Sequence, residues 1–81
     1  MGIDRGAEAW PYVQMASLLR AAIVSGQITG RLPSVGRLAQ EYELSAKTIR
    51  HALAVLAEQG YIRTVPRRGS FVRPRDGWPQ G

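Results

Sequence analysis

Two short helical patterns separated by a two-residue connection are the feature that most constrains the fold of this chain. The first runs from Ser34 or Val35 to Tyr42, with apolar residues at the i, i+3, i+4 and i+7 spacing of one helix face. The second begins after Ser45, and both serines are good N-cap residues. A connection this short forces a sharp angle between two helices, so the sequence predicts a helix-turn-helix.

The second helix, predicted from about Ala46 to Gln59, has one apolar and one polar face. Four apolar side chains cluster on one side of the helical wheel: Ile49, Ala52, Leu53 and Leu56. Polar side chains occupy the first turns elsewhere on the wheel: Lys47, Arg50 and His51, with Thr48 on the flank. A helix that reads DNA needs this asymmetry, because its first turns enter the groove and the remainder leaves it.

Two strands joined by a basic turn are predicted after this helix. The residues Ile62–Val65 are rich in β-forming side chains, and a returning strand is predicted over Ser70–Val72. The intervening PRRG has a proline that ends the first strand and a glycine suited to an unusual turn conformation. Because Pro33 disfavours helix at Leu32, that residue and Arg31 are expected to be extended and able to form a short third strand near the hairpin.

One more helix and two terminal segments complete the predicted organisation. Pro11 suits the first turn of a helix, and apolar spacing extends that helix to about Ser25. Residues 1–9 are expected to be a flexible arm, 10–73 one domain and 74–81 a flexible tail. The expected fold is mainly α with a small β-hairpin, a winged helix-turn-helix of three helices and a two-stranded wing.

Composition excludes several kinds of site. The 81 residues include no cysteine and one histidine, so the chain has neither a disulfide framework nor the ligands of a zinc site. It also lacks paired carboxylates and a nucleophile beside a base, so we expect no enzyme and no cofactor. No apolar run approaches the roughly 18 residues of a membrane span, and no signal-peptide pattern opens the chain. The expectation is a soluble cytoplasmic protein.

The basic charge lies in the half of the chain that contains the two adjacent helices and the hairpin. The net charge is +5. Residues 1–30 are neutral overall, whereas residues 31–75 carry nine basic and three acidic side chains. This distribution indicates a polyanion as partner. The alternative is a basic surface that only keeps a small domain soluble.

The order and spacing of these segments resemble the DNA-binding domain of the GntR family of bacterial transcription regulators. The resemblance covers roughly Tyr12 to Val72, and its landmarks are YVQMASLLRAAIVSGQI, GRLPS, LAQEYELS, TIRHALAVLAEQGYI and RRGSFV. Each landmark is weak alone, and their order together is specific. The family implies a winged helix-turn-helix that binds double-stranded operator DNA, usually a palindrome, as a homodimer, most often as a repressor.

The resemblance also implies roles for individual residues. By this resemblance, Ser34 caps the first of the two adjacent helices and Ser45 opens the recognition helix. The family's T-hydrophobic-R motif corresponds to Thr48 and Arg50. Its wing-tip basic residue and glycine correspond to Arg68 and Gly69.

Several positions depart from the family's pattern. Val35 and Gly36 stand where members commonly have an acid and a DNA-contacting arginine, and Ala46 stands where they often have an arginine. The wing begins with Arg67 rather than glycine. These departures affect the expected operator more than DNA binding itself. Members normally also have a ligand-sensing domain after the wing. This chain holds nine residues after Val72 and no effector domain. We therefore expect either an excised domain or a member of a short stand-alone class.

The candidate contacts of the recognition helix are of two kinds, to DNA bases and to the DNA backbone. Arg50 suits a bidentate contact to guanine, with a solvated ion pair as the alternative. Lys47 suits a phosphate, as do Thr48 and Ser45, although Ser45 is equally well explained as a cap. For His51 a phosphate, a base and a plain surface position all stay open.

The remaining candidates lie in the wing and at the start of the preceding helix. Arg67 and Arg68 suit the negative potential of the minor groove, and Gly69 allows close approach of the backbone, with a solvated turn as the alternative. Ser34 and Arg37 are expected to hold the DNA backbone.

The sequence therefore predicts a sequence-specific, double-stranded DNA-binding transcriptional regulator. The helix over residues 46–59 is expected in the major groove and the wing over residues 66–70 on the minor groove or the backbone. Two alternatives keep the fold and change the partner. One is a protein-interaction winged helix whose basic face meets an acidic protein, and the other is an RNA-binding winged helix.

Overall fold

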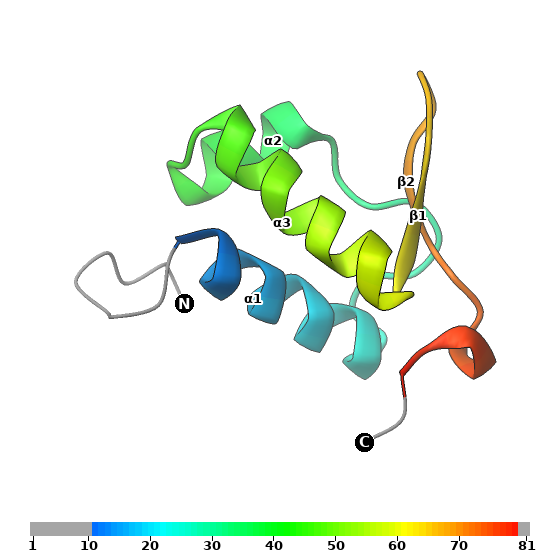
Figure 1. Ribbon diagram of the computed structural model, residues 1–81. Helices are drawn as coiled ribbons and strands as arrows, with labels where there is room; N and C mark the ends of the chain where they lie inside the picture. The colour runs from blue at the N-terminus through cyan, green and yellow to red at the C-terminus, as the bar shows by residue number, and fades with distance from the viewer. Residues whose placement is uncertain (1–10, 80–81) are drawn as a thin grey trace.

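The computed structural model describes residues 11–79 and shows three helices followed by a two-stranded antiparallel hairpin (Figure 1). The elements in chain order are α1 Pro11–Ser25, α2 Val35–Tyr42, α3 Ala46–Gln59, β1 Ile62–Val65, β2 Gly69–Val72 and the 3-10 helix η1 Arg75–Gly77. This architecture confirms the predicted winged helix-turn-helix, with the second strand beginning one residue earlier than predicted. The expected arm over residues 1–9 lies outside the described residues. Between residues 11 and 79, no helix is long and apolar enough to cross a bilayer.

Serine side chains cap the two adjacent helices as predicted. Ser34 Oγ accepts a hydrogen bond from the backbone N–H of Arg37 at 3.1 Å. Ser45 Oγ accepts one from the backbone N–H of Thr48, also at 3.1 Å. Each bond satisfies one of the N–H groups that a helix N-terminus leaves without an intrahelical partner. The start of each helix is therefore fixed by local sequence.

The sharp turn between α2 and α3 rests on one residue in an unusual conformation. Glu43 has a φ of 54° in the left-handed region, which costs a non-glycine residue roughly 1 kcal/mol or more. The next amide, Leu44 N–H, donates to the Ala39 carbonyl at 3.0 Å, and the Leu44 side chain packs on the core. Burial of Leu44 and this backbone bond offset the strain, so the turn holds α2 and α3 at their angle.

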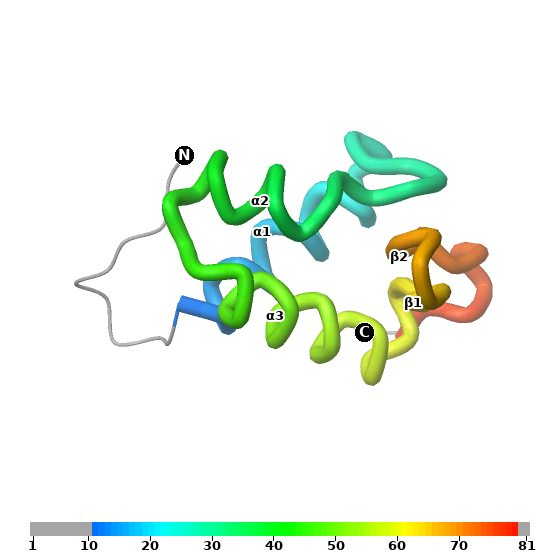
Figure 2. Tube along the Cα trace, turned by 90° about the horizontal axis from the view of Figure 1, so that it is seen from above, coloured from blue at the N-terminus to red at the C-terminus, as the bar shows by residue number. Residues whose placement is uncertain are grey.

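The core forms where α1 packs against α3. In Figure 1 the two helices lie one above the other, and the hairpin stands beside the C-terminal end of α3; Figure 2 shows α2 and α3 side by side from above. The buried apolar residues come from every main element except β2: Met15, Ala16, Leu19, Ile23, Leu32, Leu38, Ile49, Ala52, Leu53, Leu56 and Ile62. The four residues predicted for the apolar face of α3 are all among them. This packing leaves the opposite face of α3 in solvent.

The segment before α2 joins the hairpin through one β-bridge. Arg31 pairs antiparallel with Phe71 of β2. On either side of this bridge, Leu32 N–H donates to the Ser70 carbonyl at 2.9 Å and Val72 N–H donates to the Gly30 carbonyl at 2.7 Å. The predicted third strand is thus present as a single bridge, because Pro33 interrupts the extended segment.

The segment after β2 makes contacts with Tyr61 and with α1. Trp78 Nε1–H donates to the Arg73 carbonyl at 2.8 Å, and its ring lies 5.9 Å from that of Tyr61. The Arg75 guanidinium lies 4.7 Å from the centre of the Trp78 ring and also donates to the Val24 carbonyl of α1 at 3.3 Å. The Pro- and Gly-rich composition predicted a flexible tail here. Trp78 nevertheless makes these contacts, and residues 80 and 81 of the expected tail lie outside the described residues.

Candidate nucleic-acid interface

The exposed face of α3 carries two cations near its N-terminus. Lys47 and Arg50 are exposed, and Ala54 lies exposed one turn after Arg50. Ile49 and Leu53 on the opposite side are buried. Both guanidinium and ammonium donors therefore face solvent from a rigid helix.

The N-terminus of α3 is held by a pair of hydroxyl groups. Besides its bond to the Thr48 amide, Ser45 Oγ lies 2.9 Å from Thr48 Oγ1. The Ile49 N–H donates to the Ser45 carbonyl at 3.1 Å. The cap thereby uses the Thr48 amide and leaves the amides of Ala46 and Lys47 directed out of the helix end. The structure shows Ser45 in the capping role that the sequence left as one of two alternatives.

The structure places His51 against α1. Its ring stacks on the ring of Tyr12, with 3.7 Å between the ring centroids and 10° between the planes. One face of the imidazole is thereby covered, although the residue as a whole stays exposed. This pairing of a recognition-helix side chain with the first turn of α1 was not predicted, because the two residues are distant in sequence and no spacing rule connects them.

The tip of the wing is a tight turn that presents two arginines. Arg68 N–H donates to the Val65 carbonyl at 3.0 Å, and both Arg67 and Arg68 are exposed. Arg67 occupies the left-handed region with a φ of 66°, and Gly69 has a φ of 112°. A Cβ on Gly69 would lie 3.2 Å from Nε of the Arg31 side chain, which would have to shift slightly, and the positive φ itself favours glycine there. The basic tip predicted from PRRG is therefore present.

A groove lies between α3 and the wing, and we call it the α3–wing groove. Its volume is about 400 Å³. Its lining residues come from α2, α3 and the hairpin and include Val35, Arg50, Ala54, Thr64, Arg67 and Gly69. Arg50 and Arg67, which were predicted separately for helix and wing, thus border the same groove. Its lining contains no acidic side chain.

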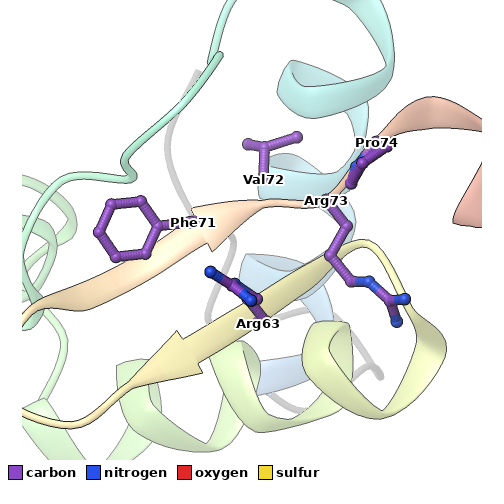
Figure 3. Close-up of a pocket in the computed structure, with 5 residues that line it drawn as sticks. All are labelled: Arg63, Phe71, Val72, Arg73 and Pro74. Carbon is purple, nitrogen blue, oxygen red and sulfur yellow. The ribbon is translucent and has the colours of Figure 1, made fainter.

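A second cationic surface lies on the other face of the hairpin, and we call it the outer wing face. Arg63 pairs across the strands with Phe71, and Arg73 follows β2 (Figure 3). Together with Val72 and Pro74, these residues line a hollow of about 510 Å³. The sequence analysis assigned no role to Arg63 or Arg73. The alternation of strand side chains was the available signal, since it puts Arg63 opposite to the buried Ile62.

The structure places some of the residues predicted to contact DNA around the α3–wing groove and others away from it. Arg50, Arg67 and Gly69 border the α3–wing groove, and Ser34 and Arg37 form the first turn of α2 next to its Val35 wall. Lys47 and Thr48 lie in the first turn of α3, and Arg68 lies at the wing tip. His51 is the exception, because it is stacked on α1.

The chain is similar to known transcription regulators. An uncharacterised HTH-type transcriptional regulator of Rhizobium meliloti is 40% identical over 65 residues, which are 78% of this chain and 27% of that protein. The arabinose metabolism transcriptional repressor of Geobacillus stearothermophilus is 31% identical over 67 residues, 79% of this chain and 18% of the repressor. The chain thus spans less than a third of either relative. A solved structure of AraR(DBD) in complex with operator ORX1 superposes with a TM-score of 0.80 at 27% identity, over 90% of this chain and 93% of that one.

The family assignment rests on most of the chain. Residues 11–72 match the family described as bacterial regulatory proteins, gntR family. These residues include all three helices and both strands of the hairpin. The resemblance seen in the sequence is confirmed, and the chain belongs to the GntR family of bacterial regulatory proteins.

Proposed function

We propose that this chain is the double-stranded DNA-binding domain of a bacterial transcription regulator and that it represses transcription by occupying an operator. The observation that carries the proposal is the α3–wing groove, where cations from the recognition helix and the wing flank one surface. An operator complex among its structural neighbours and a repressor among its relatives support the same function. The proposal gives the chain no catalytic role and places it in the cytoplasm, where bacterial DNA lies.

In this proposal, α3 enters the major groove by its first two turns. Arg50 donates two hydrogen bonds to the O6 and N7 acceptors of a guanine, which is worth about 1–3 kcal/mol of discrimination between bases. Lys47 and the exposed first amides of α3 bind phosphate oxygens. The stack on Tyr12 leaves His51 with one free ring face and a free ring edge. His51 therefore contacts the DNA backbone at the rim of the interface.

The wing and α2 hold the duplex on either side of α3. Arg67 and Arg68 at the wing tip lie on the minor groove or on its bordering phosphates. At the start of α2, Arg37 binds a phosphate, and the Ser34 cap keeps the helix end in place. These contacts position the protein, whereas Arg50 supplies sequence discrimination.

A single domain of this size makes few base contacts, so tight specific binding needs a second copy. Two domains on a palindrome contact half-sites separated by about one helical turn, roughly 34–36 Å. We therefore propose that the regulator binds its operator as a homodimer. The half-site spacing in selected operators tests this part of the proposal independently of DNA binding itself.

The proposal is tested with the full 81-residue chain by fluorescence anisotropy on duplex DNA. A random-sequence DNA duplex, a duplex RNA of the same length and an acidic polypeptide serve as probes at low salt. Binding to DNA that falls steeply with salt is the expected result, because phosphate contacts release counterions. Absence of duplex DNA binding at low salt would overturn the proposal. Preference for RNA or for the acidic polypeptide would favour the two alternative functions instead.

A further inference from the structure

The α3–wing groove lies between the two elements that the proposed function assigns to different grooves of DNA. If α3 occupies the major groove and the wing tip the adjacent minor groove, the sugar-phosphate strand that separates these grooves must pass between them. The groove between α3 and the wing is open and measures about 400 Å³. The groove is therefore the place between the two elements where this strand would lie.

The lining of the groove matches the chemistry of a sugar-phosphate strand. Arg50 and Arg67 supply cationic donors at its borders. Val35, Leu53 and Ala54 supply apolar surface, which suits the faces of deoxyribose rings. Since the lining contains no acidic side chain, nothing in it repels a phosphate. Charge and shape thus point to the same occupant.

Two hydroxyl side chains line the groove, Thr64 and Ser70, and neither has a role in the predicted interface. Thr64 of β1 is exposed, and its Oγ1 lies 3.4 Å from Oγ of Ser70 in β2. Ser70 is 9% exposed, so this contact lies on the buried side of Thr64, and either hydroxyl could be its donor. A hydroxyl that accepts from Ser70 can still donate to a phosphate oxygen on its exposed side. Thr64, which lines the groove, therefore has a hydroxyl available to the strand.

Ala54 forms part of the α3 wall of the same groove. It is exposed and lies one helical turn after Arg50. A small side chain keeps the passage between α3 and the wing open, and a longer one would extend into it. Leucine has nearly the helix propensity of alanine, so the passage can be narrowed here with little effect on α3 itself.

We infer that the α3–wing groove seats one sugar-phosphate strand of the duplex, that the Thr64 hydroxyl donates to a phosphate there, and that Ala54 must stay small to admit the strand. This inference rests on the proposed function. It adds a phosphate contact from Thr64 and a size requirement at Ala54 to the set that the sequence pattern assigned.

The test measures dissociation constants of the full chain for a random-sequence duplex of about 30 base pairs, long enough for two half-sites one turn apart. Thr64→Val, which removes the hydroxyl and keeps the shape, should weaken binding about threefold to tenfold. Thr64→Ser, which keeps a hydroxyl, should restore most of the affinity. Ser70→Ala is the matched control, because it removes the same Thr64–Ser70 contact and leaves the Thr64 hydroxyl in place. If Ser70→Ala weakens binding as much as Thr64→Val, the phosphate role of Thr64 is overturned.

The second arm narrows the groove. Ala54→Leu should weaken binding about tenfold or more, because the added atoms overlap the strand, while the slope of affinity against salt stays unchanged. Ala21→Leu on the exposed surface of α1 makes the same change outside the groove and should bind like the wild type. If the wild type binds duplex DNA and both Thr64→Val and Ala54→Leu bind it as tightly as the wild type does, the inference fails while the proposed function stands. If the wild type itself fails to bind, the proposed function fails and the inference fails with it.

Discussion

Replacing Trp78 by alanine should destabilise the domain by about 2–3 kcal/mol, although the residue lies beyond the wing. Its ring packs on Tyr61, and its Nε1–H donates to the Arg73 carbonyl. A fully enclosed aromatic side chain buries about 150–250 Å², so a half-buried tryptophan removes about 100 Å² from water. At about 25 cal/mol per Å², this burial contributes about 2.5 kcal/mol. The exposed hydrogen bond adds about 0.5 kcal/mol, and residual burial in the unfolded chain subtracts a similar amount.

Urea unfolding followed by far-UV circular dichroism measures this loss without depending on tryptophan emission. For a domain of this size, the midpoint of thermal unfolding should fall by about 10 °C or more. Trp78→Phe retains a ring against Tyr61 and loses the hydrogen bond, so it should cost about 1 kcal/mol. The exposed neighbour Pro79 supplies the control, since Pro79→Ala should leave stability within about 0.5 kcal/mol. A Trp78→Ala variant as stable as the Pro79→Ala variant would refute the packing argument.

Three further predictions concern the interface and its supports. In binding-site selection, Arg50→Ala should relax the sequence preference at one base pair. Lys47→Ala should weaken binding to all duplexes alike and lower the slope of log affinity against log salt concentration by about 1. Equal effects of the two variants would contradict their assigned roles. Ser45→Ala should cost about 1 kcal/mol of unfolding free energy in urea titrations, and an unchanged midpoint would mean that the cap contributes nothing. Gly69→Ala should cost about 1–2 kcal/mol by calorimetry, because its φ of 112° and the nearby Arg31 both oppose a side chain; a neutral result would show that the turn relaxes freely.

The elements that the sequence predicted well are those whose signals are local. The bounds of all three helices agree with the structure, because Ser34 and Ser45 mark two starts and apolar spacing marks the buried faces. The hairpin followed equally from its β-rich segments and the PRRG turn. In each case the determining residues lie within a few positions of one another, so one short window contains the whole signal.

What the sequence missed depends on pairs of residues that are distant along the chain. The stack of His51 on Tyr12 and the packing of Trp78 on Tyr61 join separate elements, and no spacing rule connects such partners. The groove that brings Thr64 beside Ala54 arises from the angle between α3 and the hairpin. That angle is set by core packing, which a single sequence does not specify residue by residue.

The bonds around the Arg31–Phe71 bridge have a consequence for how the protein meets DNA. Leu32 N–H and Val72 N–H each donate across the junction between the segment before α2 and β2. The hairpin is therefore enclosed between α3 on one side and a much earlier stretch of chain on the other, and it cannot swing away without opening both. Amide hydrogen exchange at these two positions should report the same opening free energy as the core. The wing therefore loses its conformational entropy during folding, before the protein meets an operator. Binding to DNA then carries a smaller entropy cost for ordering the wing.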